Sequence, residues 1–153
     1  MKKLGVLLAF LLLLTLCGCG KSSDMPFNGE ISFHDVTLTI PEKYIRDSTQ
    51  STDDSWLFER GWYSAQILLV RKDAAADPEA AMESYRQYLT EQGADSQKTT
   101  FLGRDALRST ADQNGKIWRE VFFYHNGSSY AVALRGGTEE EFQALLKSVG
   151  ITE

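Results

Sequence analysis

Two Asn-Gly dipeptides constrain the fold of this chain more than any other feature of its sequence. Asn114-Gly115 and Asn126-Gly127 each lie between runs rich in β-branched and aromatic residues. Both central residues of a type I′ turn need a positive φ, which Asn and Gly tolerate, so each dipeptide predicts a β-hairpin. Together they predict an antiparallel meander. Its strands are expected at residues 106–112, 116–124 and 129–135.

A two-residue loop at Asn126-Gly127 also predicts the register of the last two strands, because residues equally distant from the turn pair with each other. The expected pairs are Phe122 with Ala131, Glu120 with Ala133 and Trp118 with Arg135 on one face, and Phe123 with Tyr130 and Val121 with Val132 on the other. Large apolar groups on both faces indicate that both are at least partly covered. The alanines at 131 and 133 would let a helix approach closely on their side.

Capping residues and apolar periodicity predict two helices. The first begins at Asp77-Pro78, an N-cap followed by proline at the first helical position, and Gly93 is expected to end it. Its apolar residues at helical spacing are Met82, Tyr85 and Leu89. The second begins with a capping box over residues 138–141 and is expected to end at Gly150. Its apolar stripe is Phe142, Leu145, Leu146 and Val149.

The remaining part of the domain is rich in strand-forming patterns. Further strands are expected at residues 31–33, 36–40, 56–60 and 63–71, and the polar segment 47–55 predicts a mobile loop. The fold class is therefore α+β, with a central antiparallel sheet and helices packed on it.

The N-terminus predicts export from the cytoplasm. Lys2 and Lys3 precede an apolar run over residues 4–16. As a helix rising about 1.5 Å per residue, this run spans only ~20 Å, which is short of the ~30 Å hydrocarbon core of a bilayer. A cleaved secretory signal is the better interpretation. Because Leu16 to Cys19 resembles the bacterial lipobox, we expect cleavage before Cys19 and lipid on that cysteine; an ordinary cleaved signal with incidental cysteines is the alternative.

The predicted organisation has three parts: a signal peptide over residues 1–18, a lipidated tether over 19–28 and a single globular domain over 29–153. Without Lys2 and Lys3, 14 of the 16 basic residues remain against 21 acidic ones, a formal charge of −7. This charge argues against nucleic acid as a partner and leaves the acyl chains as the membrane anchor. The expected location is extracytoplasmic, lipid-anchored to the cell membrane or envelope.

Several short strings resemble, in order, the PsbP-like α/β/α sandwich superfamily. They are Thr37-Leu38-Thr39-Ile40-Pro41, Phe101-Leu102-Gly103-Arg104-Asp105-Ala106, Tyr130-Ala131-Val132-Ala133-Leu134 and Leu145-Leu146-Lys147-Ser148-Val149. The superfamily includes the extrinsic photosystem II subunit, a Ran-binding nuclear transport factor and many uncharacterised bacterial lipoproteins. The resemblance spans most of residues 30–153 and implies an accessory or binding role. No functional residue of those proteins maps onto a motif of this chain.

The inventory of reactive side chains argues against an enzyme. After the expected cleavage, the chain holds two histidines, His34 and His125, and one of its two cysteines, Cys19, which is expected to be acylated. No nucleophile elbow, phosphate-binding loop or dinucleotide fingerprint occurs. His34-Asp35 could contribute to a metal site or an acid–base pair, but a turn between strands explains it equally well. We therefore expect no catalytic residue, no metal and no cofactor.

The candidate recognition patch comprises Trp62, Tyr63 and Trp56. Arg60-Gly61 is expected to turn the chain, which would leave Trp62 and Tyr63 incompletely buried, and exposed aromatic residues are enriched at interfaces. Trp56 shares a strand face with Phe58, and packing in the core is the alternative for all of these aromatic residues.

Three functions remain open. The leading hypothesis is a membrane-tethered, non-catalytic interaction or accessory module for an envelope protein partner. The alternative is a small-ligand-binding lipoprotein, which would need a concave, largely apolar pocket. A hydrolase or metal-dependent enzyme is the third, and it would require His34 or His125 to meet carboxylates in a cleft.

Overall fold

The computed structural model describes residues 26–62, 64–73 and 77–152. The predicted signal peptide, the predicted lipid attachment residue Cys19 and the candidate patch residue Tyr63 lie outside these ranges. Within them, neither helix is long and apolar enough to cross a membrane. The elements in chain order are β1 (Pro26–Phe33), β2 (Val36–Arg46), β3 (Ser55–Arg60), β4 (Ala65–Asp73), α2 (Pro78–Glu91), β5 (Asp95–Phe101), β6 (Arg104–Gln113), β7 (Lys116–His125), β8 (Ser128–Arg135), α3 (Glu139–Lys147) and β9 (Gly150–Ile151).

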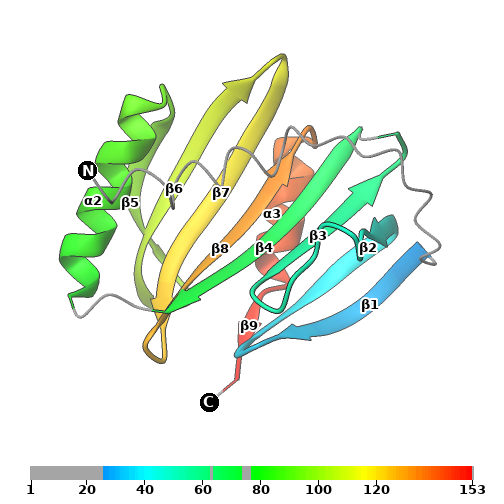
Figure 1. The fold of residues 1–153 in the computed structure, drawn as a ribbon, viewed down its shortest axis with the longest axis horizontal. Helices are drawn as coiled ribbons and strands as arrows, with labels where there is room; N and C mark the ends of the chain where they lie inside the picture. Colours follow the sequence, from blue (N-terminus) through cyan, green and yellow to red (C-terminus); the bar gives the residue numbers. More distant parts are fainter. Residues whose placement is uncertain (1–25, 63, 74–76, 153) are drawn as a thin grey trace.

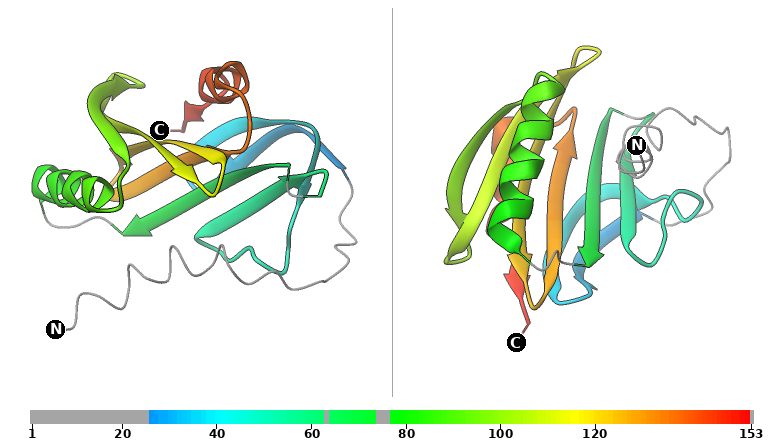
Figure 2. Two further views of the ribbon diagram at one scale, coloured as in Figure 1. Left: turned by 90° about the horizontal axis from the view of Figure 1, so that it is seen from above. Right: turned by 60° about the vertical axis from the view of Figure 1, so that its left-hand side comes forward.

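The strands form one antiparallel sheet in the order β1-β2-β3-β4-β8-β7-β6-β5, with β9 added beside β2 (Figure 1). Strands β4 and β8 pair at the centre, although most of the second half of the chain separates them. Helix α3 lies on one face of the sheet, and α2 lies toward the β5–β6 edge on the other (Figure 2). This arrangement confirms the predicted α+β fold, with a central antiparallel sheet between helices.

The predicted meander is confirmed in register as well as in outline. Asn114, Gly115, Asn126 and Gly127 all have positive φ, as the two type I′ turns require. Strands β7 and β8 pair Phe122 with Ala131, Glu120 with Ala133, Trp118 with Arg135, Phe123 with Tyr130 and Val121 with Val132. Every predicted pair is therefore present.

Helix α3 closes the main core. The Oγ1 of Thr138 accepts a hydrogen bond from the backbone N–H of Glu141, and the Glu141 carboxylate accepts one from the backbone N–H of Thr138. The capping box is thus confirmed. Glu141 also pairs with Arg60 of β3, which joins the start of the helix to the sheet. Phe142 is 0% exposed and packs in the core that spans β1, β2, β4, β7 and β8.

Two details near the ends of the domain differ from the sequence prediction. Helix α3 ends at Lys147, with Ser148 as its C-cap. Gly150 was expected to end the helix, but it lies in strand β9 and pairs with Thr37 of β2. Strand β1 begins at Pro26, so its first residues overlap the end of the predicted tether over 19–28. Both differences arise because pairing with β2, a distant strand, extends the sheet beyond what local pattern indicates.

The polar segment 47–55 is organised around one carboxylate. Asp47 is 8% exposed, and its carboxylate accepts hydrogen bonds from the backbone N–H and hydroxyl of Thr49 and from the backbone and side chain of Gln50. The Ser51 hydroxyl donates to the Asp47 carbonyl and accepts from the Leu57 N–H. An aspartate can organise a turn through its own side chain, and these bonds hold the segment together. The predicted mobility of the segment stays a prediction.

Helix α2 covers only part of its face of the sheet. Its N-cap is Asp77, whose carboxylate accepts from the Ala80 N–H at 3.2 Å, and Gly93 beyond its end has φ +76, as predicted. Met82 and Leu89 are its buried residues, and the helix contacts β5 and β6. On this face of the sheet, no helix among the described elements covers β8 and β4, the strands next to α2. The uncovered strands leave room for a cleft.

Candidate functional site

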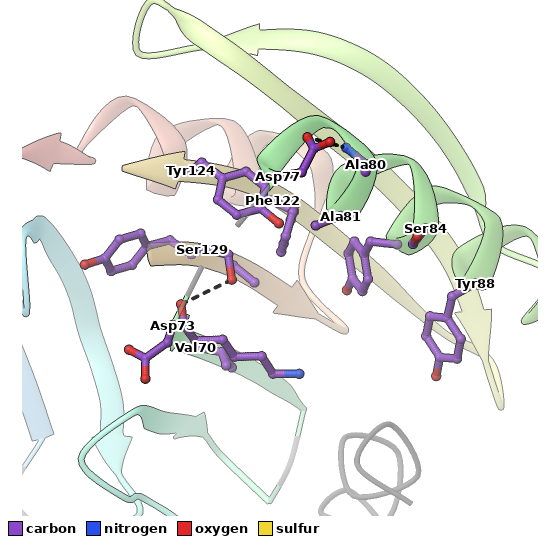
Figure 3. A pocket seen from close by; sticks show the side chains of 14 residues that line it. Val70, Asp73, Asp77, Ala80, Ala81, Ser84, Tyr88, Phe122, Tyr124 and Ser129 are labelled. Atoms are coloured by element: carbon purple, nitrogen blue, oxygen red, sulfur yellow. Dashed lines mark hydrogen bonds between the residues drawn. The ribbon is translucent and has the colours of Figure 1, made fainter. Parts of the chain in front are cut away.

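A cleft of about 600 Å³ lies between α2 and the adjacent surface of β4, β7 and β8, and we call it the α2 cleft (Figure 3). Small side chains leave this space open: Ala80, Ala81 and Ser84 line it from the helix, and Ala131 lines it from β8. Small side chains at Ala131 and Ala133 of β8 predicted that a helix would approach this face closely. The helix is on their side, but it is offset toward the edge of the sheet, so a cleft remains.

Aromatic rings form the walls of the α2 cleft. The ring of Tyr85 on α2 lies 4.5 Å, centroid to centroid, from that of Phe122 on β7. Phe122 is in edge contact with Tyr124 at 5.4 Å, and Tyr85 stacks on Tyr88 at 6.2 Å. Such a wall presents flat apolar surface to a bound molecule, and the tyrosine hydroxyls add polar positions.

Charged residues of both signs occupy one end of the α2 cleft. Lys72 and Asp73 come from the end of β4, and Asp77 is the N-cap of α2. The Ser129 hydroxyl donates to the carbonyl of Lys72 at 3.4 Å (Figure 3). Because the charges at this end are mixed, the cleft does not select a ligand by net charge alone.

A buried carboxyl group adjoins the α2 cleft on the other side of Tyr85. Glu120 of β7 is 2% exposed, and its Oε1 accepts a hydrogen bond of 2.7 Å from the Tyr85 hydroxyl. Burial raises the pKa of Glu120, while hydrogen bonds from Tyr85 and Trp118 act in the opposite direction. The predicted strand register places Glu120 on the helix-covered face, and no sequence motif assigns it a role. The one sequence signal that could have identified Glu120 is its position as a charged residue between Trp118 and Phe122 on an inward-facing strand surface.

The predicted patch residue Trp62 is almost fully exposed, at 99%. It lies in the turn between β3 and β4, where Gly61 and Trp62 both have positive φ and Ser64 donates its N–H to the Arg60 carbonyl at 3.0 Å. The core alternative is therefore excluded for Trp62. No contact in the described residues assigns it a function.

Trp56 does not join Trp62 in a common patch. It lies near the start of β3, whereas Trp62 follows the end of that strand. Its ring makes an edge contact with Phe33 at 5.1 Å, and the guanidinium of Arg46 lies 3.9 Å above it. Trp56 is thus packed at the margin of the core. The length of β3 separates it from Trp62, the other predicted patch residue that the structure describes.

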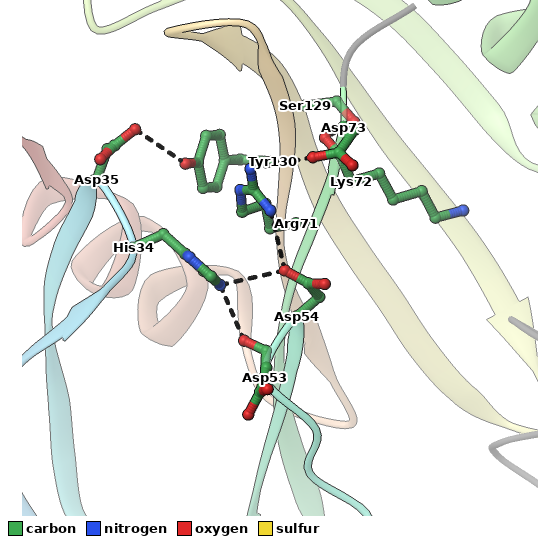
Figure 4. Close-up of polar contacts among 9 residues, drawn as sticks. All are labelled: His34, Asp35, Asp53, Asp54, Arg71, Lys72, Asp73, Ser129 and Tyr130. Carbon is green, nitrogen blue, oxygen red and sulfur yellow. Dashed lines mark hydrogen bonds and ion pairs between the residues drawn. The ribbon is translucent and has the colours of Figure 1, made fainter.

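His34 meets one carboxylate, that of Asp54, and does so outside the α2 cleft (Figure 4). Its Nε2 lies 2.8 Å from the Asp53 carbonyl and 3.3 Å from Asp54 Oδ1. Arg71 bridges Asp54 and Asp73, at 3.1 Å to each. The arginine therefore already pairs with the one carboxylate that the histidine contacts. His34 has φ +54 in the β1–β2 turn, in agreement with the turn interpretation.

A metal site and His125 are the other chemical candidates that the sequence raised. No group of three or more His, Cys, Asp and Glu side chains in these ranges could hold a metal ion. His125, at the end of β7, interacts with Arg104 through Nδ1 and with the carbonyl of Thr152 through Nε2 at 3.1 Å. These contacts tie the C-terminal end of the chain to the hairpin.

Comparisons with known proteins identify the fold. No protein-family model and no curated protein matches the chain. The solution structure of cyanobacterial PsbP (CyanoP) from Synechocystis sp. PCC 6803 matches with a TM-score of 0.57 and 9% identity, over 89% of this chain and 98% of that protein. A crystal structure from Bacteroides thetaiotaomicron VPI-5482 matches with a TM-score of 0.58 and 12% identity, over 83% of this chain. The match spans only 50% of the Bacteroides protein.

A third structure is LpqN, involved in cell envelope biogenesis of Mycobacterium tuberculosis, with 14% identity over 87% of each chain. Its TM-score of 0.43 is too low to establish a common fold. The CyanoP match covers nearly all of both proteins, so the fold of this chain is PsbP-like. At 9% identity the likeness is one of fold, and function has to be argued from the site.

Proposed function

We propose that this chain is a membrane-tethered, extracytoplasmic binding protein without a catalytic role, and that the α2 cleft is its binding site. The observation that carries the proposal is an aromatic-walled cleft of about 600 Å³ between α2 and the sheet. Small-molecule sites typically have volumes of ~300–1,000 Å³ and are lined by apolar and aromatic side chains with a few polar groups. The α2 cleft has this size and this lining.

The geometry favours a ligand in a cleft over a protein docked on a flat aromatic patch. Of the large apolar side chains in the described ranges, Trp62 alone is exposed, and Trp56 is packed away from it. By contrast, Tyr85, Tyr88 and Phe122 gather around one concavity. The small-ligand alternative from the sequence therefore becomes the preferred function, within the accessory or binding role that the PsbP-like resemblance implies.

The non-catalytic part of the proposal is supported by the distribution of reactive groups. The pairing of His34 with Asp54 lies away from the α2 cleft, and Arg71 holds the same carboxylate. The buried carboxyl of Glu120 is held by Tyr85. A hydrolytic site would need a nucleophile and a base converging on one position in the cleft.

Membrane tethering is supported by the N-terminal sequence alone. The apolar run over residues 4–16 and the lipobox-like Leu16 to Cys19 favour lipid on Cys19, seven residues before strand β1 begins. A tether of this length spans at most about 25 Å, so it would hold the domain beside the bilayer.

A filled-cleft variant tests the binding site. The full lipoprotein in lipid nanodiscs, labelled with 5-fluorotryptophan, is titrated with naphthalene, and the ¹⁹F resonance of Trp118 is followed because Trp118 bonds to Glu120 beside the cleft. Empty nanodiscs give the partition of naphthalene into lipid. We expect saturable binding that falls at least tenfold in Ala81→Phe, because the new ring would occupy the cleft.

The matched control is Ala144→Phe, which places the same ring on the exposed side of α3. This variant should bind naphthalene as the wild type does. Equal binding by Ala81→Phe and Ala144→Phe, or no saturable binding by the wild type, would contradict the proposal.

Trp62 supports a second, independent contact. A fully exposed tryptophan at a hairpin tip is suited to an envelope partner, because interface energy concentrates in such residues. Recovery of the same protein from detergent-solubilised membranes by the wild-type lipoprotein, and its loss with Trp62→Ala, would support this contact.

A further inference from the structure

Trp62, in the turn between β3 and β4, contributes little to the fold that carries it. The side chain is 99% exposed, and its φ of +44 lies in the left-handed region that bulky residues avoid. A glycine would adopt this conformation with less strain. An exposed aromatic residue with a strained backbone therefore points to a function outside the core.

The first strand begins at the same end of the sheet as this turn. Phe27 of β1 is directly opposite Tyr44 of β2, and Tyr44 is directly opposite Arg60 of β3. Neighbouring strands are ~4.8 Å apart, so the start of β1 lies about 10 Å from the end of β3. Figure 1 shows both toward the right-hand side of the sheet. The predicted tether therefore enters the domain beside the turn that holds Trp62.

The proposed lipid on Cys19 would hold this end of the sheet against the bilayer. Cys19 precedes Pro26, the first residue of β1, by seven residues, which span at most about 25 Å. Trp62 follows Arg60 by only two residues. A domain on so short a tether can therefore place this indole at the membrane surface.

The composition of the turn suits a membrane interface. Residues 61–64 are Gly, Trp, Tyr and Ser, and none of them is charged. Arg60, just before the turn, is neutralised by its ion pair with Glu141. An indole combines an apolar ring with one N–H donor, and tryptophan is enriched at the interface between membrane and water for this reason.

We infer that Trp62 inserts into the interfacial layer of the bilayer that holds the lipid anchor, and thereby orients the domain on the membrane. The inference rests on the membrane tether of the proposed function and names the envelope component that Trp62 contacts. A stable protein interface would bury ~800 Å² on each side. Among the large apolar side chains in the described ranges, Trp62 alone is exposed, and a single indole fits a lipid interface better than a protein one.

This orientation directs the charged end of the α2 cleft away from the membrane. Asp73 lines that end and is the last residue of β4, whereas Ala65 begins β4 next to the turn. At ~3.3 Å per residue, the strand runs about 26 Å between them. The charged end of the cleft therefore faces water, where a ligand can enter without crossing lipid.

Nanodiscs that contain a nitroxide lipid test the insertion. The full lipoprotein is labelled with 5-fluorotryptophan and placed in zwitterionic nanodiscs, because an excess of acidic residues gains nothing from anionic lipid. Trp62→Phe and Trp56→Phe assign the ¹⁹F resonances. We expect a nitroxide at headgroup depth to broaden Trp62 about threefold or more relative to Trp56, since β3 runs ~13 Å from Trp56 to the turn.

A longer tether separates insertion from simple proximity. About ten Gly and Ser residues inserted after Gly20 would let the domain move away from the bilayer. If Trp62 inserts, its resonance should stay broadened in this protein.

A matched pair of variants in the long-tether protein then tests the chemistry of the turn. Ser64→Glu and Ser64→Gln both remove the hydroxyl that donates to the Arg60 carbonyl, and they differ only in charge. A carboxylate resists transfer out of water, so Ser64→Glu should lose most of the broadening of Trp62 while Ser64→Gln keeps it.

The outcomes separate the insertion from the tether. Broadening that disappears with the longer tether, or equal broadening in Ser64→Glu and Ser64→Gln, would overturn the insertion and leave the anchor in place. A sharp Trp62 resonance in the anchored wild type, together with loss of a protein from the membrane pull-down in Trp62→Ala, would overturn it in favour of a protein partner. Failure of the protein to stay with the nanodiscs would overturn both the tether and the insertion.

Discussion

The hydroxyl of Tyr85 on α2 donates a 2.7 Å hydrogen bond to the carboxyl group of Glu120 on β7. This contact crosses from the helix to a buried position of the sheet, between the α2 cleft and a second cavity of about 340 Å³ under the other half of α2. Because Glu120 has little access to water, the bond contributes both to the stability of the carboxyl group and to the position of the helix.

Tyr85→Phe should lower the free energy of unfolding by about 1–3 kcal/mol, because Glu120 loses a donor while it stays buried. The ring that contacts Phe122 is retained, so packing changes little. Urea denaturation measures the effect. Tyr88→Phe is the control, because it removes a hydroxyl from the ring that stacks on Tyr85 and leaves the bond between Tyr85 and Glu120 in place. Its effect should stay within about 0.5 kcal/mol. Equal effects in the two variants would show that the bond to Glu120 contributes nothing specific.

Glu120→Gln should remove a pH dependence of stability. Burial raises the pKa of Glu120, so the folded protein holds this proton more tightly than the unfolded chain does. The contribution of Glu120 to the unfolding free energy is therefore fully present below the unfolded pKa and is lost as pH rises through the folded pKa. Relative to the wild type, Glu120→Gln should become more stable from about pH 4 upward. Denaturation over a pH series measures this difference, and a flat or opposite trend would contradict it.

Trp62→Ala should leave the free energy of unfolding within about 0.5 kcal/mol of the wild type, because the side chain is exposed. Phe142→Ala, in the core, should cost about 3–5 kcal/mol. If Trp62 meets an envelope partner, the first substitution should also weaken that association by about 2 kcal/mol or more. Thermal denaturation beside the membrane pull-down separates the two effects. Marked destabilisation by Trp62→Ala would indicate a structural role.

Cys19→Ala should abolish incorporation of a fatty-acid analogue and either release the protein from membranes or leave it unprocessed. Cys17→Ala should retain the label, because bulky Leu16 precedes that cysteine whereas Gly18 precedes Cys19. Metabolic labelling followed by membrane fractionation is the measurement. Label lost from Cys17→Ala and kept in Cys19→Ala would reverse the assignment of the lipid attachment residue.

Much of the fold could be predicted because short-range interactions determine it. The Asn114-Gly115 and Asn126-Gly127 turns require positive φ at adjacent residues, and that requirement predicts two hairpins. The two-residue loop at Asn126-Gly127 also predicts the register of the second hairpin. The caps at Asp77 and Thr138 likewise involve partners three residues away. In each case the interacting groups are close in sequence, so the pattern carries the information.

The candidate site depended on contacts between distant segments. Local patterns predicted that Tyr85 lies on a helix and Glu120 on a covered strand face, but they did not predict that the two would meet across 35 residues. The exposure of Trp62 and the packing of Trp56 against Phe33 likewise depended on how β1, β3 and β4 associate.

The sequence by itself therefore determined the strands of the meander, the helix starts and the alternation of inward and outward residues, because these follow from backbone conformation and the strand period of two. Only the tertiary structure decided that α2 lies toward the β5–β6 edge, that a cleft remains beside it and that Ser109 is buried without a partner among the described residues. The physical reason is that a cavity is a property of how far packed elements stand apart, and that spacing depends on side chains from every element at once.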